Sequence, residues 1–168
     1  MTATGKRLTL IRHAKSSWDN VSIKDSERAL TRRGEKDAAR IGQWLQQQHW
    51  RPDALRSSTA LRALMTSKII ASCADLTLSS LGKKKKLYLA EEPQLLEFIA
   101  ATPDTIQHLA IVAHNPGLLD LINTLTNSSL LSLPTCAVHI IDLPCASWQQ
   151  IGETPGKTVV ATTPKKLR

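Results

Sequence analysis

Two histidines and two arginines occupy positions from which they could act together on a phosphate group. Arg12 and His13 end one short apolar, β-branched run, and His114 follows another run of this kind. Arg62 lies one turn into a helical pattern that follows the run Asp53–Ser57. Guanidinium groups are permanently charged, planar donors suited to phosphate oxygens, and an imidazole can attack phosphorus as a covalent nucleophile. These residue types predict phosphoryl transfer by way of a histidine.

The elements that must position these residues alternate between β-rich runs and helical patterns. The predicted strands are Arg7–Arg12, Asp53–Ser57, Leu87–Leu89, Leu109–Ala113 and Thr135–Leu143, with Trp148–Ile151 and Thr158–Thr162 as edge strands. The predicted helices run from an N-cap at Thr31 to about His49, through Leu61, Met65 and Ile69, after Pro93, and after Gly117. This alternation predicts an α/β fold, a three-layer α/β/α sandwich whose mainly parallel sheet has one antiparallel strand.

Ligands of an open α/β sheet bind at the edge formed by the carboxyl ends of its strands. His13, Ser57-Ser58 and His114 all follow predicted strand ends, and helices starting behind these strands would add backbone donors for an anion. A lone histidine at a strand end is usually structural, so the predicted site depends on this shared position. The other histidines lack it and are interpreted as surface or structural residues: His49, His108 and His139.

Length and composition favour one domain spanning residues 1–168. Apolar residues make up 42% of the chain and charged residues 21%, as in ordinary soluble proteins. No apolar run approaches the roughly 18 residues of a membrane helix, and the N-terminal apolar stretch is too short for a signal peptide, so we expect a cytoplasmic protein. Cys73, Cys136 and Cys145 form no CxxC pair, so neither a disulfide framework nor a structural zinc site is predicted.

The chain carries a net charge of +8, and part of the excess is local, in the run Lys83–Lys86 and near the C-terminus. A basic surface attracts anionic partners, which include phosphorylated or acidic proteins and nucleic acids. A run of four lysines is also typical of a solvated loop, and the sequence does not decide its role. Nucleic acid is the weaker candidate partner, because aromatic residues, which stack on bases, are only 4% of the chain.

Five segments, in this order along the chain, carry a resemblance to a known family. They are Leu10–Ser16 (LIRHAKS), Arg28–Gly34 (RALTRRG), Ser57–Thr66 (SSTALRALMT), Val112–Gly117 (VAHNPG) and Leu133–Thr135 (LPT). Together they resemble the histidine phosphatase, or phosphoglycerate-mutase-like, superfamily over about residues 7–165. The alanine, lysine and serine that follow the first histidine resemble its SixA branch of phosphohistidine phosphatases.

The resemblance implies a phosphoglycerate-mutase-like fold and a metal-independent phosphatase in which His13 is the phosphorylated nucleophile. Arg12, Arg62 and His114 would complete the phosphate pocket, and these are the residues that the strand ends select. No carboxylate cluster is interleaved with them to resemble a metal cage, so we expect neither a metal nor another cofactor. Asp19 stands where the wider superfamily commonly has an asparagine, and because a carboxylate repels phosphate we assign it no phosphate contact.

The general acid of the reaction is the least defined part. The wider superfamily often supplies it from the region after the third strand, where this chain has Glu91 and Glu92. Each of these residues is a candidate general acid, and each is equally a carboxylate favoured by the dipole at a helix start.

The need for a general acid differs between classes of phosphorylated substrate. An alkoxide leaving a phosphate ester needs a proton, whereas a phosphorylated imidazole can take one from solvent, because imidazole titrates near pH 6.5. The short chain also leaves no room for a large insertion over the pocket, so a phosphate displayed on another protein could enter. We therefore expect hydrolysis of phosphohistidine on a protein, such as a histidine-containing phosphotransfer domain. The alternatives are a phosphatase of small phosphate esters, such as a sugar phosphate or nucleotide, and a non-catalytic module that binds phosphate or nucleic acid.

Overall fold

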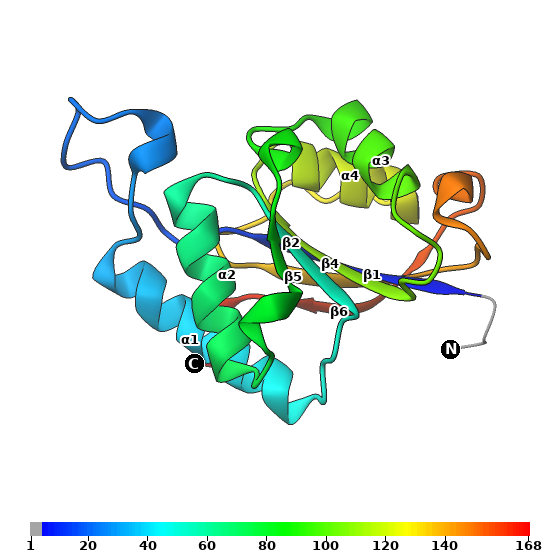
Figure 1. The fold of residues 1–168 in the computed structure, drawn as a ribbon, viewed down its shortest axis with the longest axis horizontal. Helices are drawn as coiled ribbons and strands as arrows, with labels where there is room; N and C mark the ends of the chain where they lie inside the picture. The colour runs from blue at the N-terminus through cyan, green and yellow to red at the C-terminus, as the bar shows by residue number, and fades with distance from the viewer. Residues whose placement is uncertain (1–4) are drawn as a thin grey trace.

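Parallel pairing places three of the predicted strands next to one another at the centre of a mixed sheet. The computed structural model describes residues 5–168, and within them six strands pair in the order β3-β2-β4-β1-β5-β6 (Figure 1). Their bounds are β1 Lys6–Arg12, β2 Ala54–Ser57, β3 Leu81–Lys83, β4 His108–Ala113, β5 Val138–Leu143 and β6 Lys157–Thr162. In this part of the chain β5 alone runs against the others, because it is antiparallel to both β1 and β6. Residues 1–4, where the predicted domain and the segment tested as a signal peptide begin, lie outside the described residues.

Two pairs of helices cover the two faces of the sheet (Figure 1). Helices α1 (Arg32–Gln47) and α2 (Leu61–Cys73) pack on one face, and α3 (Glu92–Ala100) and α4 (Gly117–Thr126) on the other. Thr31 is the N-cap of α1, since its Oγ1 accepts a hydrogen bond from the Gly34 amide at 3.0 Å. The predicted three-layer sandwich with one antiparallel strand is confirmed. Within residues 5–168, no helix combines the length and apolar character needed to span a membrane.

Side chains of the central strands alternate between the two helical layers. Leu8 and Leu10 of β1 and Ile111 of β4 join the apolar cluster under α3 and α4, whereas Ile11 and Val112 join the cluster under α1 and α2. All five side chains are fully buried. Because both faces of these strands are covered, their sequences are continuous apolar runs, which is what made them recognisable.

Two of the predicted strands are wrong. Leu87–Leu89 is not a strand, because Leu87 ends a 3-10 turn, Lys85–Leu87, and Leu89 has a left-handed φ of 51°. The third strand is Leu81–Lys83, which pairs in parallel with β2. Only one of its three residues is strongly apolar, so its strand conformation depends on pairing with a neighbour that the local sequence does not reveal.

The segment Trp148–Ile151 is not an edge strand, since Trp148–Gln150 forms a 3-10 turn. The Trp148 side chain is buried, and its Nε1 donates to the carbonyl of Ile106 at 2.7 Å. The aromatic residue therefore anchors a turn to the core. The other predicted edge strand is confirmed as β6.

Strand order determines where the predicted site residues meet. In the sheet β4 lies between β2 and β1, and all three are parallel. The backbone amide of Ser58, behind β2, donates to Val112 of β4, and that of His13, behind β1, donates to Ala113. The first residues beyond these three strands, which include His114, are therefore held side by side at one edge.

Candidate active site

The two histidines behind β1 and β4 face each other at this edge. Their ring centroids are 5.2 Å apart, and the ring planes are inclined by 53°. Only 7% of the surface of His13 and 2% of that of His114 are exposed. The structure thus brings together two residues that lie far apart in the sequence and removes both almost completely from water.

One nitrogen of His13 is held as a hydrogen-bond donor. Its Nδ1 lies 2.8 Å from the carbonyl oxygen of Ala14, which can only accept, so Nδ1 carries the hydrogen. Burial lowers the pKa of His13 to about 4, opposed by the Ala14 hydrogen bond and assisted by the charges of Arg62, Arg12 and Arg28. The ring is therefore neutral at pH 7, and the lone pair lies on Nε2.

His114 adopts the opposite tautomer. Its Nε2 lies 2.7 Å from Oγ of Ser58, and its Nδ1 lies 3.4 Å from Nη2 of Arg62. Because a guanidinium can only donate, Nδ1 is the acceptor and Nε2 carries the hydrogen toward Ser58. Burial, followed by the charges of His13 and Arg62, lowers the pKa of His114 to about 3. Both rings are therefore neutral at pH 7.

The two predicted arginines flank the histidines. Arg62 is 2% exposed, and it donates to the backbone carbonyl and the carboxylate of Asp25 at 2.8 and 3.0 Å. Arg12 donates through Nη1 to the carbonyl of Leu133 at 2.9 Å. Among the described residues, the Nε atoms of both arginines are buried without a hydrogen-bond partner. Buried donors are normally paired, so these N–H groups fit a site that receives an anion.

Sequence reasoning missed Asp25, which begins the 3-10 turn Asp25–Glu27 between β1 and α1. Its carboxylate pairs with Arg62 at 3.0 Å and Arg28 at 3.2 Å, and it accepts a hydrogen bond from the hydroxyl of Tyr88. Burial opposes ionisation, but the hydrogen bonds from Tyr88 and Arg62 outweigh it and lower the pKa of Asp25 to about 2. The prediction that a helix starts behind the first strand is wrong, because this turn precedes α1.

Two further residues that the sequence did not assign complete the surroundings. Arg28 is buried and donates to Oγ of Ser16 at 2.6 Å, while its guanidinium lies 3.5 Å from the centre of the Trp18 ring. The RALTRRG segment contained Arg28 and was the one signal that pointed to it. The ring of Tyr88 packs edge-on against His114, with 5.7 Å between ring centroids.

The acidic candidates lie at the start of α3. Glu91 is the N-cap of α3 and Glu92 is its first residue, and the Glu91 amide donates to Oε1 of Gln94 at 2.7 Å. Within residues 5–168, no hydrogen bond or ion pair joins either glutamate carboxylate to the histidines or arginines of the site. Asp19 is exposed to solvent. These positions agree with the helix-start interpretation of the two glutamates.

The arrangement combines an unprotonated imidazole nitrogen with buried guanidinium groups. Such groups bind a dianionic phosphoryl group, and the free Nε2 of His13 can attack its phosphorus. In the described part of the chain, no group of three or more His, Cys, Asp or Glu side chains is placed to hold a metal ion.

Known proteins resemble this chain in sequence and in fold. The family model of the histidine phosphatase superfamily (branch 1) matches residues 8–83. An uncharacterized chloroplastic protein of Arabidopsis thaliana is 31% identical over 158 residues, which are 89% of this chain and 72% of that protein. The structure of the protein histidine phosphatase SixA complexed with tungstate has a TM-score of 0.81 at 21% identity, covering 96% of this chain and 99% of SixA. A mycobacterial glucosyl-3-phosphoglycerate phosphatase has a TM-score of 0.64 at 13% identity, covering 93% and 98%.

The family model covers three of the five sequence segments, Leu10–Ser16, Arg28–Gly34 and Ser57–Thr66. The segment matched by the family model contains Arg12, His13 and Arg62. The match to SixA extends over almost the whole of both chains and includes the β5 and β6 region beyond the matched segment. The chain belongs to the histidine phosphatase superfamily.

Proposed function

We propose that this protein hydrolyses phosphohistidine carried by another protein, through a covalent phosphate on Nε2 of its own His13. The observation that carries the proposal is the tautomer and the low pKa of the His13 ring. Its Nδ1 donates to the Ala14 carbonyl and its pKa is about 4, so at pH 7 it offers a lone pair on Nε2 among cationic side chains. A nucleophile must present such a lone pair at the pH of the reaction.

The reaction has two balanced steps. Nε2 of His13 forms a bond to phosphorus while the bond from phosphorus to the substrate imidazole breaks. The leaving nitrogen keeps that electron pair, and a proton taken from solvent by the ring lets it leave as neutral histidine. Water then attacks phosphorus, the bond to Nε2 breaks with its electron pair returning to Nε2, and the excess proton passes to solvent. The products are histidine, inorganic phosphate and the original enzyme.

Arg12, Arg62 and His114 support both steps. The guanidinium groups bind phosphoryl oxygens and stabilise the charge that develops on them. A bound dianion favours the protonated form of His114, whose Nδ1 can then donate to an oxygen. Asp25 holds the Arg62 guanidinium through two hydrogen bonds, which fixes its orientation before substrate binds.

The leaving group determines the substrate class. Asp25 is ionised, with a pKa of about 2, so it does not serve as an acid near neutral pH. An alkoxide would need such an acid, whereas an imidazole takes its proton from solvent. This favours cleavage of a P–N bond. We further propose that the reaction needs no metal or other cofactor. SixA, whose fold this chain shares, is described as a protein histidine phosphatase. The cytoplasmic location stays a prediction.

Rates on matched substrates test the proposed function. We expect kcat/KM on a phosphohistidine peptide to exceed that on a phosphoserine peptide or a sugar phosphate by at least about 100-fold, the lower end of what general-acid catalysis contributes. His13→Ala should abolish release of inorganic phosphate, whereas His49→Asn, at an exposed position behind α1, should retain it. Faster turnover of the sugar phosphate would identify a phosphatase of small esters instead. Absence of hydrolysis with salt-dependent binding of random oligonucleotides would identify a binding module.

Loss of one guanidinium should slow the reaction without unfolding the protein. Arg62→Ala should lower kcat/KM on the phosphohistidine peptide by roughly 150-fold, which corresponds to about 3 kcal/mol of transition-state stabilisation from one preorganised donor. Arg40→Ala, at an exposed position on α1, is the control. Circular dichroism verifies that both variants are folded. Normal turnover by the folded Arg62 variant would show that Arg62 does not contribute to phosphate binding in the reaction.

Burial lowers the pKa values of His13 and His114, and this makes the free energy of unfolding depend on pH. In an NMR titration the His13 ring should protonate near pH 4, with its signal assigned from its loss in His13→Gln. Because this folded-state pKa lies below the unfolded value of about 6.5, the free energy of unfolding should fall as the pH decreases from about 6.5 toward 4. Because tungstate is an anion, its binding should raise the pH at which the His13 ring is half protonated in the NMR titration. A His13 midpoint near 6.5 in the free protein would contradict the proposed neutral nucleophile.

A further inference from the structure

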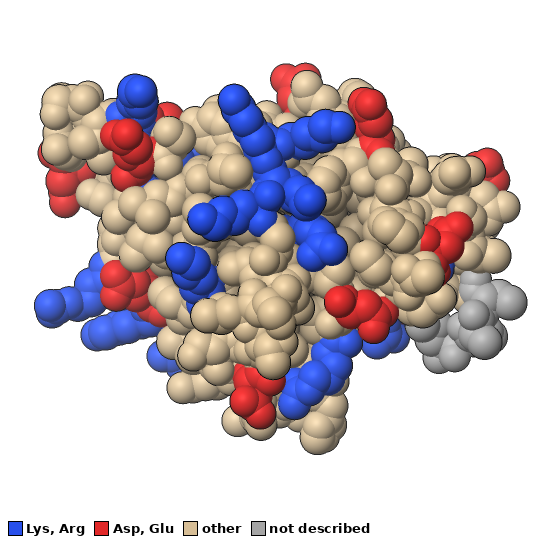
Figure 2. All heavy atoms as spheres, in the orientation of Figure 1, with Lys and Arg blue, Asp and Glu red and all other residues tan. Residues whose placement is uncertain are grey.

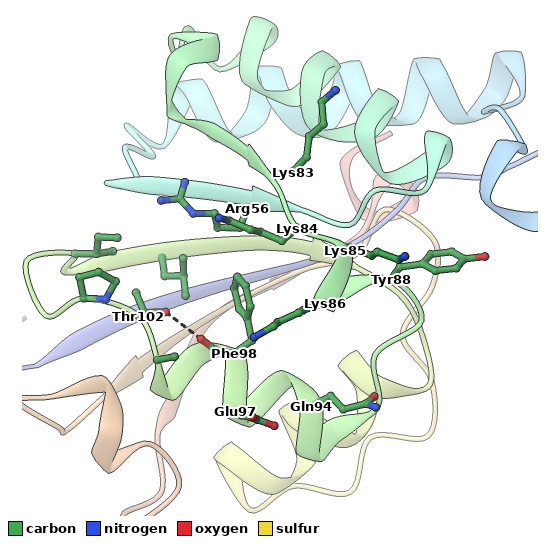
Figure 3. Close-up of a pocket in the computed structure, with 14 residues that line it drawn as sticks. Arg56, Lys83, Lys84, Lys85, Lys86, Tyr88, Gln94, Glu97, Phe98 and Thr102 are labelled. Atoms are coloured by element: carbon green, nitrogen blue, oxygen red, sulfur yellow. Dashed lines mark hydrogen bonds between the residues drawn. The ribbon is translucent and has the colours of Figure 1, made fainter.

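A hollow of about 910 Å³ lies between the Lys83–Lys86 run and α3 (Figure 3). Its cationic lining is Arg56 and the four lysines, and its apolar lining includes Phe98, Ile106 and Leu109. We call this hollow the lysine groove. Its lining contains five cationic side chains and one carboxylate, that of Glu97. The chemistry of the active site uses none of these groups.

The lysine run is a fixed part of the fold. Lys83 ends β3, and the Lys84 amide donates to the carbonyl of Ser57 at 2.8 Å, directly behind β2. The Leu87 amide donates to the carbonyl of Lys84, and the Leu87 side chain is fully buried. A loop that merely extends into solvent would lack these anchors. These contacts hold the backbone of the four lysines in place beside the hollow.

The charges of the groove are concentrated and largely uncompensated. All four lysines are exposed, and within residues 5–168 none forms an ion pair. Figure 2 shows basic side chains gathered in the middle of this face of the molecule. Figure 3 shows Lys86 extending toward Phe98 and Lys85 pointing toward the Tyr88 end of the groove. Positive charges confined in this way favour a bound anionic partner.

The apolar lining narrows the kind of partner. Phe98 and Ile106 are half-buried, so each still presents apolar surface. An inorganic anion or a polyphosphate has no apolar group that could pack against this surface. The hollow, of about 910 Å³, is also far larger than one phosphate. A protein segment with both acidic and apolar side chains would bury apolar area and pair with the lysines at the same time.

Tyr88 connects the groove with the active site. It lines the groove, its ring lies 5.7 Å from that of His114, and its hydroxyl donates to Asp25, the carboxylate that holds Arg62. Tyr88 therefore contacts both the groove and His114 of the proposed phosphate pocket. A chain lying in the groove would bring a neighbouring residue to the phosphate pocket.

We propose that the lysine groove docks an acidic, apolar-containing segment that flanks the phosphohistidine of the protein substrate, a proposal that rests on the proposed function above. Docking lowers KM for a substrate with this flanking sequence. It has no effect on a phosphorylated molecule too small to reach the groove.

A pair of synthetic phosphohistidine peptides tests the proposal. One carries flanking glutamate and leucine residues, and the other has glutamine in place of every glutamate. Wild-type protein should prefer the glutamate peptide by about tenfold in kcat/KM, mainly through KM. The double variant Lys84→Glu/Lys86→Glu should lose this preference while hydrolysing free phosphohistidine normally. The control is Lys36→Glu/Lys165→Glu, at exposed positions on α1 and near the C-terminus. Each Lys→Glu change lowers the net charge of +8 by two, so both double variants have the same net charge. The control should keep the preference for the glutamate peptide.

The outcomes separate the groove from the catalytic proposal. Equal rates on the two peptides, with free phosphohistidine hydrolysed, would overturn docking and leave the proposed function intact. If no phosphohistidine is hydrolysed, the proposed function fails, and binding of the unphosphorylated peptides, measured by fluorescence anisotropy, still tests the groove. Weaker binding of the glutamate peptide to the groove variant but not to the control supports docking, and equal binding overturns it. A labelled oligonucleotide provides a further test of the docking proposal. The proposal would also be overturned if the oligonucleotide bound the wild type but not the Lys84→Glu/Lys86→Glu variant, and if the glutamate peptide did not displace it.

Discussion

The hydrogen bond from Nδ1 of His13 to the carbonyl of Ala14 determines which nitrogen of the ring can react. Without it, a buried neutral imidazole could place its hydrogen on either nitrogen. With it, Nε2 keeps the lone pair, and burial together with three neighbouring arginines lowers the pKa to about 4. Burial is the largest cause of this low pKa, and the positive charges of the arginines add to it. In the proposed reaction, the arginines that would bind phosphate thus also help to keep Nε2 unprotonated.

The sheet order makes this arrangement possible. Because β4 lies between β2 and β1, three parallel strands end side by side, and the residues behind them meet although they are far apart in the chain. Asp25 adds an internal counter-ion from the turn that precedes α1. Its carboxylate orients Arg62, and its hydrogen bond from Tyr88 connects the site with the surface that carries the lysine run. The candidate active site and the basic surface are thus adjacent.

The sequence predicted those features that depend on local pattern. Strands buried on both faces are continuous apolar runs, so β1 and β4, and with them His13 and His114, were recognisable. Thr31 was recognisable as an N-cap because its hydroxyl can accept from the first turn. The place of Arg62 in the helical pattern behind the second predicted strand selected it as well, and the resemblance to the family added the roles of these residues and the phosphoglycerate-mutase-like form of the fold.

Features that depend on long-range contacts were not predictable in this way. Leu81–Lys83 is a strand only because β2 pairs with it, and Trp148 resembled a strand residue although its indole anchors a turn. Asp25 was not singled out, because two of its partners, Arg62 and Tyr88, come from α2 and from the segment before α3. The lysine run was visible in the sequence, but its anchoring behind β2 and the apolar lining opposite it exist only in the folded chain.

The position of phosphate on the trapped intermediate tests the central claim most directly. Wild-type protein is mixed with a phosphohistidine peptide and quenched rapidly, and the labelled residue is mapped by mass spectrometry. Phosphorus NMR of the denatured phosphoprotein then distinguishes the two ring nitrogens. The tautomer fixed by Ala14 predicts phosphate on residue 13, bonded to Nε2. Phosphate on Nδ1 of that ring, on His114, or on no residue of a protein that still turns over would contradict the account.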